Sequence, residues 1–290
     1  MTPDRHGSGA TRIEADLSIK NEGENLMRRA STCLAVLGLA LLALPGVASA
    51  KPTVKFKAEA VPIPGFKGTG NILGAGSAVQ TEYKIEGTEY FGSPPPIIGI
   101  NFYLPKGSKL HTSGFPICSK TTLEQFGPVQ CRRGSAAGPI GKVQGYVTLG
   151  GERVEEGLEL SSFYAPGGGF EFFSKGTSPV SIEILSNGHY VHLGGAGSYG
   201  PELETEVPLV ASLPGAPYAS VKTITVKAGS AYTTGKGKHK QTIYYGRVPT
   251  KCPKGGFPLK TEVIFAENGE LGKPETVTKT YKAPCPPRRR

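Results

Sequence analysis

Glutamates set among apolar residues are the side chains best suited to chemistry. Glu171 lies between Phe170 and Phe172, Glu183 lies in the run SIEIL, and Glu204 lies in ELETEV. Burial raises the pKa of a carboxyl, as a general acid requires, and a pair of Glu can hydrolyse a glycosidic bond. Strand alternation also lets each of these side chains face water. A Glu-dependent polysaccharide hydrolase is therefore an alternative, and no residue is assigned as catalytic.

The acidic residues exclude several other reactions. Both aspartates, Asp4 and Asp16, precede residue 51, so residues 51–290 contain only Glu as an acid. This excludes a Ser-His-Asp triad, although not its Glu variant. It also excludes the aspartic-protease pair and Asp-rich calcium loops.

The spacing of the Glu and His residues does not indicate a metal site. Glu202, Glu204 and Glu206 share one strand face, which we interpret as solvated. His189 and His192 are three residues apart on a strand and therefore face opposite sides, while His111 and His239 fall in loops. We predict no metal and no cofactor.

A glycine motif at residues 195–200 (GAGSYG) matches G-x-G-x-x-G and loosely resembles a nucleophile elbow. Both sites need a strand that turns into a helix. Here Pro201 follows, and residues 202–207 alternate as a strand. We interpret these glycines as turn residues.

The positive charge points to anionic partners. Lys and Arg number 33 and Asp and Glu 23, a net charge of +10. Residues 234–241 (TGKGKHKQ) form a basic loop, with Lys236, Lys238 and Lys240 as candidate anion-binding residues, and the chain ends in three arginines. Anionic cell-wall or extracellular polymers suit this charge, whereas no nucleic-acid-binding module is visible. The alternative is a hairpin loop that only promotes solubility.

The N-terminal region predicts export. Met27-Arg28-Arg29 begins a basic segment, residues 33–47 are almost wholly apolar, and Ala48-Ser49-Ala50 matches a cleavage site. We predict a signal peptide over 27–50, cleaved after Ala50, and a secreted domain over 51–290. Residues 1–26 are a polar leader that is non-native if translation starts at Met27. No later run is long enough to cross a membrane as a helix.

The cysteines support an extracellular location. Cys118, Cys131, Cys252 and Cys285 follow the leader, an even number that argues for disulfides. Four cysteines allow three pairings. We favour Cys118–Cys131 and Cys252–Cys285 because each closes a local loop.

The hydropathy pattern predicts an all-β protein. Alternation marks strands over residues 54–59 and 79–86, β-branched runs over 221–226 and 242–245, and a dense apolar run over 97–104 that suits a central strand. Gly and Pro residues occur in nearly every segment between the predicted strands. We predict a β-sandwich, jelly-roll-like or Ig-like; the alternative is two smaller β units split near residue 145.

Two hairpins and one helix complete the prediction. Asn187-Gly188 suits a type I′ turn between SIEILS and HYVHL, and Asn268-Gly269 marks a second turn. Residues 119–126 (SKTTLEQF) are predicted to form a short helix with a Ser or Thr cap, with Glu124 three residues after Thr121.

Two segments carry a resemblance. They are LPKGSKLHTSGFPICSKTTLE, followed by Cys131 and GSAAGPIGK, and YYGRVPTKCPKGGFPLKTEVIF, followed by TVTKTYKAPCP. Together they resemble functionally uncharacterised, secreted, disulfide-containing β-rich proteins of high-GC Gram-positive (actinobacterial) type. The resemblance implies export, a β-sandwich and two disulfides in sequence order, and it supplies no functional residues.

The leading hypothesis is a secreted, non-enzymatic β-sandwich that binds anionic cell-wall or extracellular polymers. The alternatives are the Glu-dependent hydrolase and a protein-interaction subunit of an exported assembly.

Overall fold

A computed structural model describes residues 51–192, 197–267 and 270–286. The predicted signal peptide, the leader before it, the Asn268-Gly269 turn and the C-terminal arginines lie outside these ranges. Residues 49–290 group as one compact unit. No helix among the described residues is long and apolar enough to cross a membrane.

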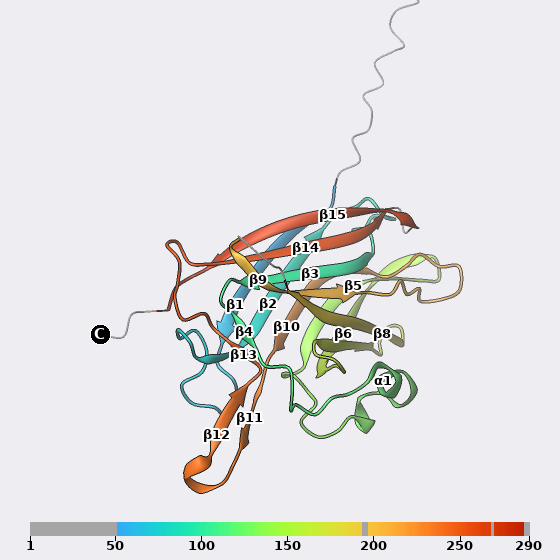
Figure 1. Cartoon of the computed structure of the whole chain (residues 1–290). Coiled ribbons are helices and arrows are strands. Elements are labelled where there is room, and N and C mark those ends of the chain that lie inside the picture. Colours follow the sequence, from blue (N-terminus) through green and yellow to red (C-terminus); the bar gives the residue numbers. More distant parts are fainter. Residues whose placement is uncertain (1–50, 193–196, 268–269, 287–290) are drawn as a thin grey trace, which may run out of the picture. The chain divides into compact units, whose positions relative to one another are not determined.

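The unit is built almost entirely from antiparallel strands (Figure 1). They are β1 (Thr53–Val61), β2 (Gly76–Glu86), β3 (Ile97–Pro105), β4 (Lys109–Leu110), β5 (Gly141–Leu149), β6 (Glu152–Tyr164), β7 (Phe170–Gly176), β8 (Ile182–His192), β9 (Tyr199–Glu206), β10 (Ser220–Ala228), β11 (Ala231–Thr234), β12 (Gln241–Tyr244), β13 (Gly246–Arg247), β14 (Phe257–Glu267) and β15 (Glu270–Ala283). The helical elements are α1 (Lys120–Phe126) and the 3₁₀ turns η1 (Pro128–Gln130) and η2 (Gly237–His239).

The predicted strands follow from alternation. In β2, Thr81, Tyr83 and Ile85 are buried, whereas Lys84 and Glu86 are exposed. The denser apolar strand β3 pairs with β14 on one side and β9 on the other, which confirms its predicted central place. Every residue of β3 is buried or half-buried, in contrast to the alternating burial at the end of β2, so the dense apolar run corresponds to a strand covered on both faces.

The main sheet folds over on itself into two layers. Its order is β15-β14-β3-β9-β8-β7-β6-β5-β10-β2-β13-β4, and β1 pairs with β2. Across the interior, Tyr83 of β2 and Thr261 of β14 share a hydrogen bond of 3.2 Å between their hydroxyls. Phe56 of β1 packs against Phe102 of β3 at 6.0 Å and against Tyr281 of β15 at 6.4 Å between ring centroids. The all-β sandwich is confirmed.

The core is divided rather than continuous. Three clusters of buried apolar side chains lie between the layers, centred on Tyr164 and Tyr245, on Val263 and Phe265, and on Val143 and Leu160. Residues from all three clusters line one apolar cavity of about 220 Å³. The centre of the sandwich is therefore not filled by the chain's own side chains.

The predicted Asn187-Gly188 hairpin is wrong. Residues 182–192 form one continuous strand, β8, in which Asn187 pairs with both Glu171 and Glu206. A Cβ on Gly188 would lie 3.2 Å from the ring of Phe172 and 3.3 Å from Leu203. The glycine is thus explained by close packing within the sheet and not by a turn.

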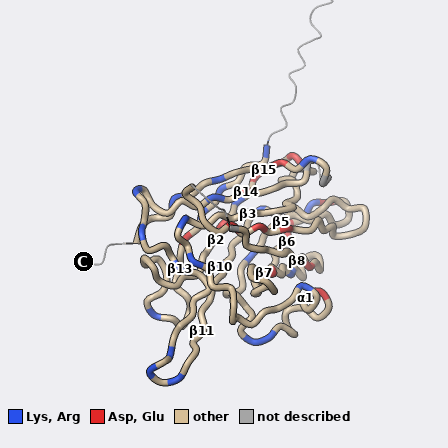
Figure 2. The backbone as a smooth tube through the Cα atoms, viewed as in Figure 1, with Lys and Arg blue, Asp and Glu red and all other residues tan. Residues whose placement is uncertain are grey.

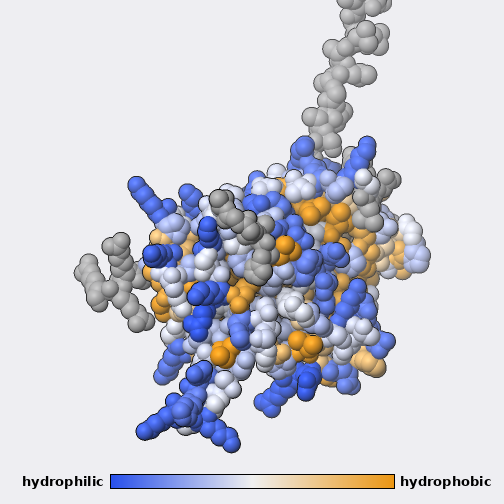
Figure 3. Space-filling view, in the orientation of Figure 1, coloured by the Kyte–Doolittle hydropathy of each residue, from blue (hydrophilic) through white to orange (hydrophobic). Residues whose placement is uncertain are grey.

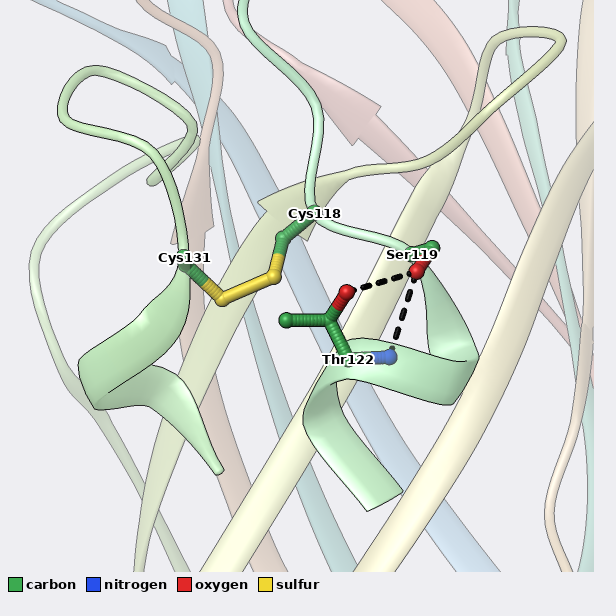
Figure 4. The surroundings of a disulfide bond; sticks show 4 residues. All are labelled: Cys118, Ser119, Thr122 and Cys131. Carbon is green, nitrogen blue, oxygen red and sulfur yellow. Dashed lines mark hydrogen bonds between the residues drawn. A yellow bond between two sulfur atoms is a disulfide. The ribbon is translucent and has the colours of Figure 1, made fainter. Parts of the chain in front are cut away.

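The predicted helix and the first disulfide form one small unit outside the sheet (Figure 4). Ser119 caps α1, because its Oγ accepts a hydrogen bond of 3.2 Å from the backbone N–H of Thr122. The cap is therefore Ser119 and not Thr121, and Glu124 instead lies 3.7 Å from Lys120 one turn away. The Cys118–Cys131 disulfide closes the segment that contains α1 and η1.

The second disulfide joins the two ends of the last hairpin. Cys252 precedes β14 and Cys285 follows β15, and the two cysteines are bonded. Both favoured pairings are confirmed. The first bond encloses the helical segment, whereas the second closes the open end of the β14–β15 hairpin.

Candidate anion-binding surface

The predicted lysine loop is the tip of a projecting hairpin. β11 and β12 form a separate two-stranded sheet, from Ala231 paired with Tyr244 to Thr234 paired with Gln241. In Figure 1 this hairpin extends away from the main sheet at the bottom of the view. Lys236, Lys238 and Lys240 lie at its tip (Figure 2), and all residues from 233 to 241 are exposed. Figure 3 shows a hydrophilic surface over this projection.

Aromatic contacts anchor the hairpin at its base. A two-stranded hairpin alone is marginally stable in water. Here the ring of Tyr232 packs against Phe115 at 4.9 Å, and the ring of Tyr244 lies 6.5 Å from Phe66. At the tip, Gly235 has φ +82° and a Cβ there would collide with the backbone oxygen of His239. The base is therefore held by the core, while the tip is a tight turn that needs glycine.

The tip lysines have no carboxylate to neutralise them. Among the ion pairs of the described residues, none includes Lys236, Lys238 or Lys240. The charged residues of the surrounding sequence are also all basic, since residues 207–261 contain nine Lys or Arg and no Asp or Glu. Most of the net charge of +10 thus comes from the part of the chain that carries this hairpin.

Two more cations lie at the hairpin's base. Arg247 of β13 pairs with Lys109 of β4, and directly opposed residues project from the same sheet face. The Arg247 guanidinium stacks on the ring of Tyr244 at 4.7 Å. The tip and the base together form a basic surface made of Lys236, Lys238, Lys240, Arg247 and Lys109.

The structure buries Glu171, the first of the hydrolase candidates. Glu171 is 2% exposed, and Oε1 accepts a hydrogen bond of 2.8 Å from the Asn187 amide. Its other oxygen, Oε2, has no hydrogen-bond partner. Burial raises the pKa of the Glu171 carboxyl. A raised pKa suits a general acid, but a buried side chain cannot reach a polymeric substrate.

The other two candidates are partly exposed, and their strand positions are distant from that of Glu171. Glu183 forms an ion pair with Lys175 at 2.6 Å, and Glu204 lies 3.3 Å from His189. The sheet register separates Glu183 from Glu171 by four residues along the strands, or about 13 Å. The separation of Glu204 from Glu171, two strands and two residues away, is about 12 Å. These backbone separations exceed the distance of about 5–9.5 Å between the two carboxyl groups of a glycosidase, so the sheet register gives no support for a catalytic pair among these three residues.

The interpretation of Glu202 as solvated is wrong. Glu202 is 4% exposed and lies opposite Tyr103, whose hydroxyl donates a hydrogen bond of 2.8 Å to Glu262. Burial raises the pKa of Tyr103 most, and the nearby carboxylates of Glu202 and Glu262 raise it further. Lys260 lies over the ring of Tyr103, with its ammonium 3.5 Å from the ring centre. Long side chains from neighbouring strands therefore bury a residue whose own sequence pattern predicts exposure.

The remaining motifs show no chemical arrangement. Among the described residues, no group of three or more His, Cys, Asp or Glu is placed to hold a metal ion. Of the glycine motif, residues 193–196 lie outside the described ranges, and Gly200 lies within strand β9. A strand, and no helix, therefore follows the motif.

Sequence reasoning missed the cations at the base of the hairpin. Lys109 and Arg247 are separated by more than a hundred residues and meet only through the pairing of β4 with β13. The long stretch without acidic residues, 207–261, is the signal that points to the surface as a whole.

Comparison with protein-family models, curated proteins and solved structures finds no match to this chain.

Proposed function

We propose that residues 27–50 direct the chain out of the cytoplasm, and that the domain from residue 51 binds anionic extracellular polymers through the basic surface. One observation carries this proposal: a projecting hairpin presents three exposed lysines that form no ion pair within the described part of the chain. The two disulfides are compatible with an oxidising compartment outside the cytoplasm.

The geometry fits an extended, flexible polyanion better than a small anion. Three exposed lysines lie on a narrow turn, and Arg247 of β13 and Lys109 of β4 add two cations at the base of the hairpin. This arrangement offers several exposed charges to one extended chain. Each cation near an anionic surface contributes about 1 kcal/mol at physiological salt, so the three tip lysines together supply on the order of 100-fold in affinity.

The test uses residues 51–290 with both disulfides intact. Binding to isolated cell wall, to poly(glycerol phosphate) and to polygalacturonate is measured at low and high salt. The variant Lys236→Gln/Lys238→Gln/Lys240→Gln should bind on the order of 10- to 100-fold more weakly at low salt. Wild-type binding should be lost near 1 M salt, where the screening length is about 3 Å.

A matched control separates this site from net charge. Lys57, Lys142 and Lys279 are exposed residues of the main sheet. Changing these three to Gln removes the same charge elsewhere and should leave binding nearly unchanged. Equal losses in both triple variants, or no binding to any of the three polymers at either salt, would refute the proposal.

The hydrolase alternative gains no geometric support, because Glu171 is buried and the sheet register places the backbone of Glu183 and of Glu204 about 12 Å or more from that of Glu171. Its test is the release of reducing sugar from polysaccharides by the parent protein. Release that Glu171→Gln abolishes would favour this alternative.

A further inference from the structure

The interior of the sandwich contains space that the chain does not fill. The cavity measures about 220 Å³ and is lined by both layers. Its walls include Val79, Ile100, Phe172, Ile184, Ile224 and Val226. Although these six side chains belong to or pack against the core clusters, all of them are only half-buried. An inward-facing side chain of a filled sandwich loses its exposure, so these residues border accessible space.

The cavity has no charged side chain directed into it. Of the described residues that line it, only Glu59 and Arg247 are charged. Strand alternation turns Glu59 outward, because its neighbours Ala58 and Ala60 pack in the core. Arg247 is turned onto the ring of Tyr244. The walls therefore offer nothing to neutralise a ligand's charge.

A few hydroxyl groups supply the polar part of the lining. Thr81, Ser174, Ser186 and Thr205 lie in the wall, together with the phenol of Tyr190. Burial raises the pKa of Tyr190 well above its ordinary value, so this phenol stays neutral. Such a lining can bond a hydroxyl or carbonyl group while it excludes an ion.

From this geometry we infer that the cavity is a binding site for an uncharged, apolar small molecule. A dry apolar cavity of about 150 Å³ binds benzene, so the larger cavity here has room for more than one aromatic ring or for an aliphatic chain. Transfer of such a molecule from water to this interior is favourable because apolar surface leaves water on both sides. Arg247 is the one described residue shared by this cavity and the basic surface, and it stacks on Tyr244, so we expect binding in the cavity not to depend on salt or on the tip lysines.

The test is a titration with N-phenyl-1-naphthylamine, a neutral dye that fluoresces in apolar surroundings. Residues 51–290 should bind it with equal affinity at low and high salt. The straight-chain alcohols from hexanol to dodecanol should displace it. The matching alkyl sulfates should displace it at least about tenfold less well, since Arg247, the one cation among the described lining residues, is turned onto Tyr244.

Two variants place the dye in the cavity. Ile224→Trp fills the space and should weaken dye binding at least about tenfold. Its control is Thr225→Trp, the next residue of β10, which is exposed and should bind as wild type does. If Ile224→Trp does not fold by circular dichroism, Ile184→Phe on β8 fills the opposite wall and carries the same expectation.

Three results would overturn the inference: no dye binding to the folded protein, equal binding by wild type and the cavity-filling variant, or equal displacement by alcohols and sulfates. The lysine triple variant should bind dye as wild type does. The polymer-binding assay and the dye titration thus distinguish a failure of the proposed function from a failure of this inference.

Discussion

Replacement of Glu171 by Gln should stabilise the protein at neutral pH. The side chain is 2% exposed, and its Oε2 has no hydrogen-bond partner. Leaving a buried polar atom unsatisfied costs about 1–3 kcal/mol, and more when the group is charged. Gln keeps an oxygen to accept from Asn187 and removes the charge. Because its own amide N–H groups also need partners, we expect a net gain of about 1 kcal/mol, or about 2–4 °C in Tm for a domain of this size.

The gain should depend on pH in a defined direction. Burial raises the pKa of Glu171 above the ordinary value of 4.5. Below that value the carboxyl is protonated in both the folded and the unfolded state, and the wild type loses nothing. As pH rises through 4.5, the unfolded state ionises first, so the wild type loses stability relative to the variant. The difference should therefore be present at pH 7 and nearly absent at pH 4.

The assay is urea unfolding followed by circular dichroism at both pH values, with Glu183→Gln as the control. Glu183 is on the same face of the adjacent strand, but it is half-exposed and paired with Lys175. Its change should cost less than about 1 kcal/mol at pH 7. The reasoning is refuted if Glu171→Gln is no more stable than wild type at pH 7, or if its gain is undiminished at pH 4.

Two further predictions concern the disulfides and the helix cap. Removal of Cys118–Cys131 should lower the free energy of unfolding by about 3 kcal/mol and removal of Cys252–Cys285 by about 4 kcal/mol, because the second bond encloses the longer loop (33 residues against 13). Urea unfolding of the two Cys→Ala double variants checks this order. A larger loss for the Cys118–Cys131 variant would contradict it. Ser119→Ala should lower the free energy of unfolding by about 1 kcal/mol, as measured by thermal unfolding, whereas Ser119→Asp should retain the cap and the stability. Equal losses in the two variants would show that the cap hydrogen bond is unimportant.

A second buried carboxylate has an evident structural role. Glu156 is 2% exposed, and its Oε2 accepts a hydrogen bond of 3.0 Å from the backbone N–H of Val180. Val180 belongs to the turn between β7 and β8. Glu156 thus holds this turn from the neighbouring strand β6 through Oε2, while its Oε1 has no hydrogen-bond partner among the described residues.

The empty interior has a thermodynamic consequence. Many of its apolar wall residues are only half-buried, so a bound apolar molecule would remove them from water. A ligand that binds only the folded chain raises the free energy of unfolding by mass action, so N-phenyl-1-naphthylamine should raise Tm as it occupies the cavity.

Local patterns determined much of this protein. Alternation was sufficient to place β1 and β2, because side-chain direction on a strand repeats every two residues whatever the strand pairs with. A β-branched run was sufficient to place β10. The cysteine pairing was predictable because each bond closes a short loop. The Ser119 helix followed from a cap that lies within four residues of its partner.

Tertiary structure decided what depends on residues distant in sequence. Asn187-Gly188 has the composition of a turn, but pairing with β7 and β9 on both sides keeps the chain extended. Glu202 is buried only because side chains of other strands fold over it. The lysines of the basic loop were visible in the sequence, whereas their projection on an anchored hairpin depends on Phe115 and Phe66. The cavity exists because two layers meet without filling the space between them, and no local pattern encodes the volume enclosed by strands that far apart.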